Sequence, residues 1–498
     1  MMQDQKKIII KALLEKDILV TEQILEILPD DFNIEEFYTD YYTKTEDEQQ
    51  LIKDIKNYLN KNIEQKNNTI QITDEIQNPI ERKVKIITSY KDEPKKRSIN
   101  DFISYYNKRY QQIKKMLLNR MELSGAISIN KISTRNDNEP IALVVIISEK
   151  TITKNNNLVI KAEDPTGEIT IIINKNRPET MELAKTLVLD EIIGVIGTVK
   201  NKTLYANTLF LPDIPLSKEL KKAPIEEYAL FISDIHVGSN FFLGEQFNKF
   251  INFLNGNIVN NQYKELVPKI KYVFMMGDLV DGVGIYPGQE KELKITDIYE
   301  QYTEFSRLIS KISKNISLII CPGNHDAVRL CEPQPPLTKV IAKALYEFEN
   351  VFLVSNPAMV NIAATATFPG LDVLLYHGYS FDYYISNIDE IRNNGGYDRA
   401  DLIMKFLLQK RHLAPTHAST LFIPEIEHDP LVISKIPDIF CTGHIHKVSA
   451  SNYRNITLVS GSCWQDTTKF QEKMGHHPEP CRVPMINLQT REVRILKF

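Results

Sequence analysis

The spacing of hydrophobic residues changes along the chain and divides it into regions. Residues 1–40 carry apolar side chains at helical intervals, which predicts a small helical N-terminal unit. Residues 41–97 are polar and irregular, and we expect a linker with some transient helix there. In residues 98–120 apolar side chains recur at steps of three and four among many lysines and arginines, which predicts a basic amphipathic helix.

Residues 121–212 change to a hydrophobic period near two, which is typical of short strands. Turn-rich segments separate five predicted strands, which begin at Leu123, Ile141, Leu158, Gly167 and Ile192. A helical stretch from Pro178 to Leu187 precedes the last of them. This order of elements predicts an OB-fold β-barrel.

Residues 225–498 form one large α/β unit in which five apolar strands each run into a group of polar residues. These groups are Asp234-Ile-His236, Gly277-Asp278-Leu-Val-Asp281, Gly323-Asn324-His325-Asp, His377-Gly and Gly443-His444-Ile-His446. Side chains that follow a strand gather at the edge of a sheet, where the sites of α/β proteins lie. The i, i+2 spacing predicts that the paired residues lie on one side of an extended chain. Carboxylate, amide and imidazole donors together favour manganese, iron or zinc over magnesium or calcium.

The basic helix allows two interpretations. Its charged face is either merely solvated, or it contacts nucleic-acid phosphates. The candidate phosphate contacts are Lys108, Arg109, Lys114, Lys115 and, from a later basic segment, Arg411. The barrel also allows two interpretations, as a scaffold or as a domain that binds single-stranded nucleic acid. Binding of single strands uses aromatic side chains that stack on bases, and the barrel offers only Tyr205 and Phe210.

Composition narrows these possibilities. The 498 residues predict about three domains, and a net charge of −4 means that any binding of nucleic acid depends on local basic patches. The five cysteines form no CxxC pair, which argues against a zinc ribbon and a disulfide framework. We expect no signal peptide and no membrane span, and therefore a cytoplasmic protein.

The five polar groups, in this order, resemble the motif string of the calcineurin-like metallophosphoesterase superfamily over residues 229–447. The resemblance implies a two-sheet β-sandwich flanked by helices and two divalent metal ions, manganese being favoured and iron, zinc or magnesium being alternatives. By analogy, one metal is held by Asp234, His236 and His446, and the other by Asn324, His377 and His444. Asp278 bridges the two ions, and His325 acts as the acid or transition-state stabiliser.

Two departures from related subfamilies concern the residues after Asp278. Protein phosphatases of this superfamily carry an arginine after the second aspartate of the motif, but Gly282 follows Asp281 here, which argues against that activity. Nucleases of double-strand-break repair usually carry a second catalytic histidine where Asp281 stands. A direct copy of their two-histidine mechanism is therefore not expected.

The order of helical unit, linker, barrel and phosphoesterase domain looks like that of the small subunits of archaeal family-D DNA polymerases. Segments such as residues 98–110, 410–417 and 463–474 support this resemblance, which spans about residues 95–498. It implies a 3′→5′ exonuclease that acts on single-stranded or mispaired DNA ends and assembles with a large catalytic subunit. The sliding clamp is left open as a further partner. The alternatives are a catalytically silent accessory subunit and a stand-alone phosphodiesterase.

Overall fold

The computed structural model describes residues 37, 50, 53–55, 84–91, 95–134, 138–257, 263–425, 427–468, 471 and 477–498. The chain divides into two compact units, Met1–Glu81 and Arg82–Phe498. The helical unit predicted for residues 1–40 lies outside the described residues, apart from residue 37. Everything below concerns the second unit.

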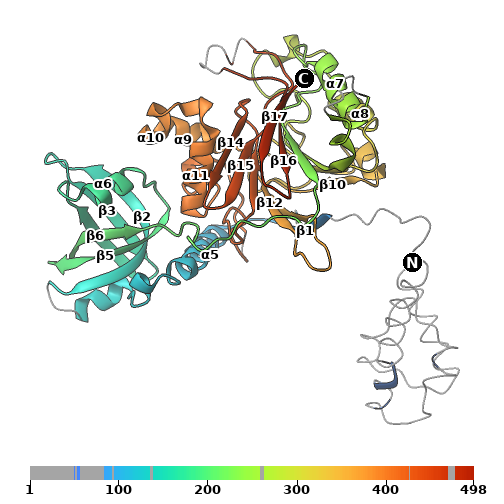
Figure 1. Ribbon diagram of the computed structural model, residues 1–498. Helices are drawn as coiled ribbons and strands as arrows, with labels where there is room; N and C mark the ends of the chain where they lie inside the picture. Colours follow the sequence, from blue (N-terminus) through green and yellow to red (C-terminus); the bar gives the residue numbers. More distant parts are fainter. Residues whose placement is uncertain are drawn as a thin grey trace. The chain divides into compact units, whose positions relative to one another are not determined.

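Two six-stranded sheets form the larger part of this unit (Figure 1). They are built from β1 at its start and from strands that follow the barrel. The first sheet has the order β1-β11-β12-β13-β15-β14, with strands Val84–Ser89, Ala358–Ile362, Leu371–Leu375, Ile439–Thr442, Ile456–Ser460 and Ser449–Tyr453. The second has the order β10-β9-β8-β7-β16-β17, with strands Val351–Leu353, Ser317–Cys321, Ile270–Met276, Tyr228–Ile232, Arg482–Asn487 and Val493–Lys497. The five strands predicted to precede polar groups are β7, β8, β9, β12 and β13, which confirms that part of the prediction.

The two sheets pack face to face, and helices cover their outer faces. Phe231 of β7 and Val373 of β12 belong to one buried cluster between the sheets. Helices α7 (Gly244–Leu254) and α8 (Ile298–Ile309) cover the outer face of the second sheet. Helices α9 (Phe381–Asn387) and α11 (Ala400–Lys410), with α10 (Asp389–Asn393) beside α9, cover the first sheet (Figure 1). The prediction of a helix-flanked two-sheet sandwich is confirmed.

The central strands are mostly apolar because both of their faces are covered. All five residues of β7, Tyr-Ala-Leu-Phe-Ile, are buried, as are those of β12. Strands β7, β8, β9 and β10 are mutually parallel, as are β12, β13 and β15. Such strands read as continuous hydrophobic runs, and their carboxyl ends lie at one edge of each sheet.

A closed five-stranded barrel precedes the sandwich, with the order β2-β3-β4-β6-β5. Its strands are Pro140–Ile152, Leu158–Asp164, Gly167–Ile173, Thr203–Phe210 and Ile192–Lys200, and α6 (Pro178–Lys185) lies between β4 and β5 in the chain. The OB-like barrel is thus confirmed, but the strand predicted from Leu123 is wrong. That segment begins as a 3₁₀ helix, Met121–Leu123, whose Leu123 packs outside the barrel, and β6 supplies the fifth strand.

The predicted linker of residues 41–97 is corrected at its end, because residues 84–89 form β1. This strand pairs antiparallel with β11, with Val84 opposite Ile362 and Ser89 opposite Ala358. An edge strand is held by backbone hydrogen bonds to one neighbour and needs little apolar surface of its own. Ile86 of this strand is accordingly 43% exposed.

The predicted basic helix is α5 (Ile99–Leu117), and Ser98 and Asp101 form a capping box at its start. Its buried residues are Tyr105, Arg109, Tyr110, Ile113 and Leu117. Ile113 and Leu117 pack with Val144 of the barrel and Val432 of the phosphoesterase part. The helix therefore joins the two. None of the helices in the described ranges is long and apolar enough to cross a membrane.

Candidate metal centre

The candidate ligands follow strands of both sheets. Asp234 comes two residues after β7, Asp278 two residues after β8, and Asn324 three residues after β9. His377 follows β12, and His444 follows β13. Because the two sheets pack face to face, these strand ends converge, and the structure brings all seven predicted ligands together.

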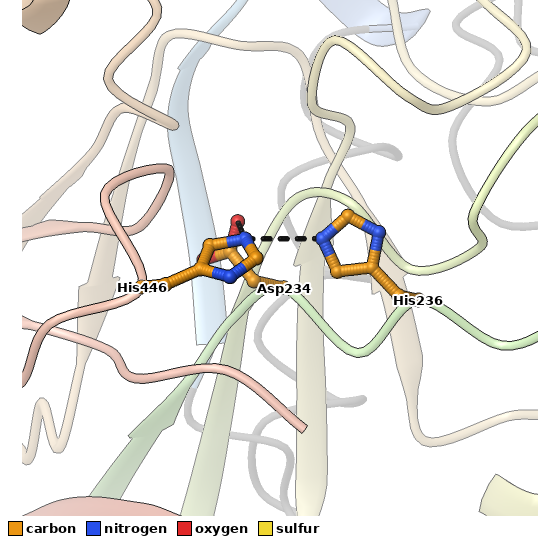
Figure 2. Close-up of side chains that lie close together, drawn as sticks. All are labelled: Asp234, His236 and His446. Carbon is orange, nitrogen blue, oxygen red and sulfur yellow. Dashed lines mark hydrogen bonds and ion pairs between the residues drawn. The ribbon is translucent and has the colours of Figure 1, made fainter. Parts of the chain in front are cut away.

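The first cluster contains Asp234, His236 and His446, whose ligand atoms lie within 4.8 Å of one another. The Nε2 atoms of His236 and His446 are 3.1 Å apart, and His446 Nε2 is 3.4 Å from Asp234 Oδ1. Figure 2 shows the two rings pointing toward each other beside the carboxylate. Asp234 is completely buried. A buried carboxylate and two imidazoles aimed at one point form a ligand set for a divalent transition metal.

The second cluster contains Asp278, His377 and His444, again within 4.8 Å. His377 Nε2 lies 2.9 Å from Asn324 Oδ1 and 3.4 Å from Asp278 Oδ2. The same oxygen, Asp278 Oδ2, is 4.0 Å from His236 Nε2 of the first cluster. Asp278 therefore stands between the clusters, as expected of a bridging carboxylate.

The backbone at these residues differs from the extended chain that the i, i+2 spacing predicted. Five of the seven candidate ligands have φ between 51° and 73°, namely Asp234, His236, Asp278, His444 and His446. This left-handed region is uncommon for residues other than glycine and costs about 1–3 kcal/mol at each position. Such conformations concentrate at functional sites, where the surrounding structure imposes them. The expected extended geometry is thus wrong, although the residues still converge.

Two glycines allow the ligand loops to approach closely. Gly277 has φ of 82°, and an added Cβ would lie 2.6 Å from Nδ1 of His377. At Gly323 an added Cβ would lie 2.3 Å from Oδ1 of Asp278. A side chain at either position would push a ligand away from the cluster, so these two positions require glycine for steric reasons.

Hydrogen bonds to the remaining ring nitrogens orient the histidines. His236 Nδ1 lies 3.1 Å from Asp281 Oδ1, and His377 Nδ1 lies 2.7 Å from the carbonyl oxygen of Met276. His444 uses Nε2 for Asp382 Oδ2 at 2.9 Å. Each acceptor favours a proton on the nitrogen that faces it, which leaves the other nitrogen as a lone-pair donor. The fourth histidine, His446, has Nδ1 2.9 Å from the side-chain amide of Gln471.

Electrostatics at the centre favour a bound cation. Burial opposes ionisation of Asp278, but the neighbouring histidines, His377 foremost, hold the pKa of that carboxyl well below its usual range. Burial likewise opposes protonation of His377, but the charge of Asp278 raises the pKa of His377 to about 10. A carboxylate that stays ionised while buried needs a positive partner. The donor atoms, their orientation and this charge therefore fit two divalent metal ions.

His325 lies beside the clusters without belonging to either predicted ligand set. Its Nδ1 lies 2.8 Å from the carbonyl oxygen of Asp281, and its backbone nitrogen donates to Asp278 Oδ1 at 2.8 Å. His325 lines a pocket of about 230 Å³ together with His236, His444 and His446. With Nδ1 occupied, Nε2 is the nitrogen available to a substrate.

Several residues of the site escaped sequence reasoning. Gln465 and Gln471 come from the C-terminal segment, Asp382 from α9, and Tyr286 and Tyr379 from loops after β8 and β12; all five line the pocket. No spacing rule marks them, because they reach the site through tertiary packing. Position was the only available signal: Tyr379 is two residues from His377, and Gln465 follows the buried Trp464.

The residues predicted to contact nucleic acid differ in how far they are buried. Arg109 is 1% exposed and donates to Asp429 at 2.6 Å, and Arg411 is 4% exposed and donates to two backbone carbonyls. Neither side chain can reach a DNA phosphate, so both predictions are corrected. Lys108 and Lys115 are exposed on α5 and Lys114 is half-buried, so these three stay predictions.

Further histidines and the cysteines lie outside the candidate ligand set. His412 is buried, with Nε2 2.9 Å from Asp429 Oδ2. His417 lies 2.6 Å from Asp190, and His428 is exposed, away from the metal ligands. All five cysteines are unpaired, as predicted.

Comparisons with known proteins bear on this architecture. The family model that describes the B subunits of DNA polymerases alpha and epsilon matches residues 229–450. The DNA polymerase II small subunit of Methanothermobacter thermautotrophicus is 38% identical over 390 residues, which cover 78% of each chain. That of Methanocaldococcus jannaschii is 40% identical over 393 residues, which cover 78% of this chain and 64% of the relative.

A solved structure described as a novel archaeal phosphodiesterase is 13% identical and matches 54% of this chain and 99% of its own, with a TM-score of 0.27. The relationship therefore rests on the sequence relatives and on the domain model, which covers every candidate metal ligand. The chain belongs to the family of small subunits of the archaeal DNA polymerase II, the family-D polymerase.

Proposed function

We propose that this chain is a metal-dependent 3′→5′ exonuclease that removes nucleotides from single-stranded or mispaired DNA ends. It works as the small subunit of a replicative polymerase whose nucleotide-adding activity belongs to the complex with a large catalytic subunit. Membership of the family supports the assignment to a polymerase. The metal centre supports the nuclease activity. Its mixed donor set suits manganese, iron or zinc, and manganese is the ion that we propose.

The observation that carries the proposal is the position of Asp278. One oxygen of this carboxylate faces a histidine of each cluster, at 3.4 Å and 4.0 Å. Two adjacent ions, when bound, activate a water and stabilise the attacking and leaving oxygens of a phosphodiester. A scaffold would need neither a shared carboxylate nor strained backbone at five ligands.

The residues of the chain have distinct roles in this reaction. The ligand clusters place the scissile phosphate at the base of the pocket, where water displaces the 3′ oxygen of the preceding nucleotide. His325 lines the same pocket with Nε2 available, and it stabilises or protonates that leaving oxygen. Asp281 holds His236 in its ligand orientation through Nδ1.

The size of the pocket supports a single-stranded end as substrate. Its volume of about 230 Å³ is below the common range for drug-sized ligands, about 300–1,000 Å³. A pocket of this volume fits part of a single terminal nucleotide. Lys108 and Lys115 on α5 are the exposed cations that we assign to the DNA backbone.

We assign the barrel mainly to scaffolding. The outward side chains of β3 and β4 include Lys161, Glu163 and Glu168, and Lys161 pairs with Glu149 at 2.8 Å. This mixed charge does not attract a polyanion, and Tyr205 is the one exposed aromatic residue between 138 and 212. A buried ion pair instead attaches the barrel to the neighbouring part of the protein. It joins Glu191, beside β5, to Lys410 of α11.

Incubation with manganese and a 5′-labelled single-stranded oligonucleotide tests the proposal. The purified chain, alone and in complex with its large subunit, should shorten the oligonucleotide stepwise from the 3′ end. His325→Ala should lower the rate by about 100-fold or more, and His428→Ala, an exposed histidine, should not change it.

The same experiment distinguishes the alternatives. Absence of cleavage in every divalent metal, with and without the large subunit, would establish a scaffold. Cleavage of small phosphodiesters but of no oligonucleotide would identify a stand-alone phosphodiesterase.

A further inference from the structure

The pocket at the metal centre is lined by two tyrosines that belong to neither cluster of candidate ligands. Tyr286 comes from the loop after β8, and Tyr379 comes from the loop after β12. Both are half-buried, so each ring has one part packed against the protein and another part open. These two loops follow strands of different sheets of the sandwich.

Tyr379 lies directly beside the second cluster of ligands. Its ring centroid is 5.8 Å from that of His444, with an interplanar angle of 62°. In the parts of the chain that the structure describes, we find no hydrogen bond that holds its hydroxyl group. The ring is therefore positioned by packing, and it lines the pocket together with His444 and His325.

The short segment around Tyr286 contains no charged residue. Residues 282–288 read Gly-Val-Gly-Ile-Tyr-Pro-Gly, and the exposed fractions of Val283 and Ile285 are 48% and 39%. The Tyr286 hydroxyl donates to Glu292 at 2.8 Å, which fixes the ring at the end of this loop. Contacts to phosphates come from cationic or hydrogen-bonding side chains and from backbone N–H groups. An apolar rim with a fixed aromatic ring instead suits the flat face of a base.

We propose that Tyr379 and Tyr286 contact the unpaired base of the 3′-terminal nucleotide while its phosphodiester is at the metal centre. This inference rests on the proposed exonuclease function and names the part of the substrate that the pocket recognises. Stacking on aromatic side chains tolerates every base because each base has a π-face. The proposed contact is to a base without a pairing partner, so it favours frayed or mispaired termini.

A pair of oligonucleotides tests this inference. One ends in a normal 3′ nucleotide, and the other ends in an abasic tetrahydrofuran analogue with the same phosphodiester. The wild-type protein with manganese should release the normal nucleotide about tenfold faster at subsaturating substrate, which corresponds to one stacked base. Tyr379→Ala should bring the ratio of the two rates close to one, and Tyr379→Phe should restore it. Tyr286→Ala should lower the ratio as well.

The ratio separates base recognition from damage to the metal centre, because such damage slows both substrates alike. Tyr299→Ala is the matched control, since Tyr299 is 51% exposed on α8 and should leave the ratio unchanged. A wild-type ratio near one, or a ratio that Tyr379→Ala leaves intact, would overturn the inference while the exonuclease stands. If the wild-type protein cleaves neither oligonucleotide in manganese, the proposed function fails and the inference fails with it.

Discussion

Asp281 accepts a hydrogen bond from His236, with Asp281 Oδ1 3.1 Å from His236 Nδ1 and both side chains buried. Two glutamines hold the same carboxylate: Gln465 donates at 2.9 Å and Gln289 at 3.1 Å. The aspartate that stands where related nucleases usually carry a histidine thus acts on a metal ligand. It fixes the ring so that Nε2 faces the first cluster.

Replacing Asp281 should therefore weaken the binding of one metal ion. We expect Asp281→Asn to lower manganese affinity at the first cluster by about 10- to 100-fold, because the amide is uncharged and orients His236 less firmly. Calorimetric titration of the metal-free protein measures this change. Glu290→Gln, an exposed carboxylate in the same loop region, is the control and should bind like the wild type. Unchanged affinity in Asp281→Asn would contradict the role.

Asp382 makes the corresponding contact to the second cluster, at 2.9 Å from His444 Nε2. The Asp382 side chain is 47% exposed, so water competes with the contact, and Asp382→Asn should cost only about tenfold in affinity. The loss should affect one ion of the pair. Electron paramagnetic resonance should then detect isolated manganese in place of a coupled pair, whereas simultaneous loss of both ions would show that Asp382 does more than orient His444.

Arg109 should prove structural rather than DNA-binding. Arg109→Met leaves the buried Asp429 without its main cation, which should lower the free energy of unfolding by about 3–5 kcal/mol. Urea unfolding measures the loss. The double variant with Asp429→Leu should recover much of it, and Lys108→Met on the exposed face should change the unfolding free energy by no more than about 0.5 kcal/mol.

The exposed lysines of α5, unlike Arg109, should contribute to DNA binding. Each phosphate contact that is lost should reduce the slope of log affinity against log salt by about 0.7 for single-stranded DNA. The variant Lys108→Gln/Lys115→Gln should therefore reduce that slope by about 1.4 in fluorescence anisotropy titrations. An unchanged slope would remove both residues from the DNA interface.

His412 should make stability depend on pH in the weakly acidic range. Burial, together with the nearby Arg109, lowers the pKa of His412 from 6.5 to about 4. The unfolded chain therefore binds more protons than the folded chain between these two values, so stability is complete above pH 6.5 and is lost as the pH falls toward 4. The loss should reach about 3 kcal/mol.

Unfolding measured across this pH range checks the expectation. His412→Gln, whose amide can still donate to Asp429, should show a smaller slope because it cannot take up a proton. An equal slope in both proteins would assign the pH dependence to other groups.

Local sequence patterns were enough to predict many of the strands and the candidate metal ligands. The apolar runs of β7 and β12 were recognisable because parallel strands covered on both faces bury every residue. The candidate ligands were also recognisable, since histidine and aspartate after a strand and beside a glycine form a local motif. The edge strand β1 and the segment at Leu123 were misjudged, because their pairing or packing partners lie far away in the chain.

What the sequence determined by itself was the set of side chains able to bind metal and the strands that carry them. Only the tertiary structure decided the rest: that Asp278 stands between two clusters, that Asp281 and Asp382 orient histidines, and that Arg109 and Arg411 are buried. The physical reason is that burial and hydrogen bonding depend on which distant segments meet. A basic residue looks the same in a sequence whether it faces water or a buried carboxylate.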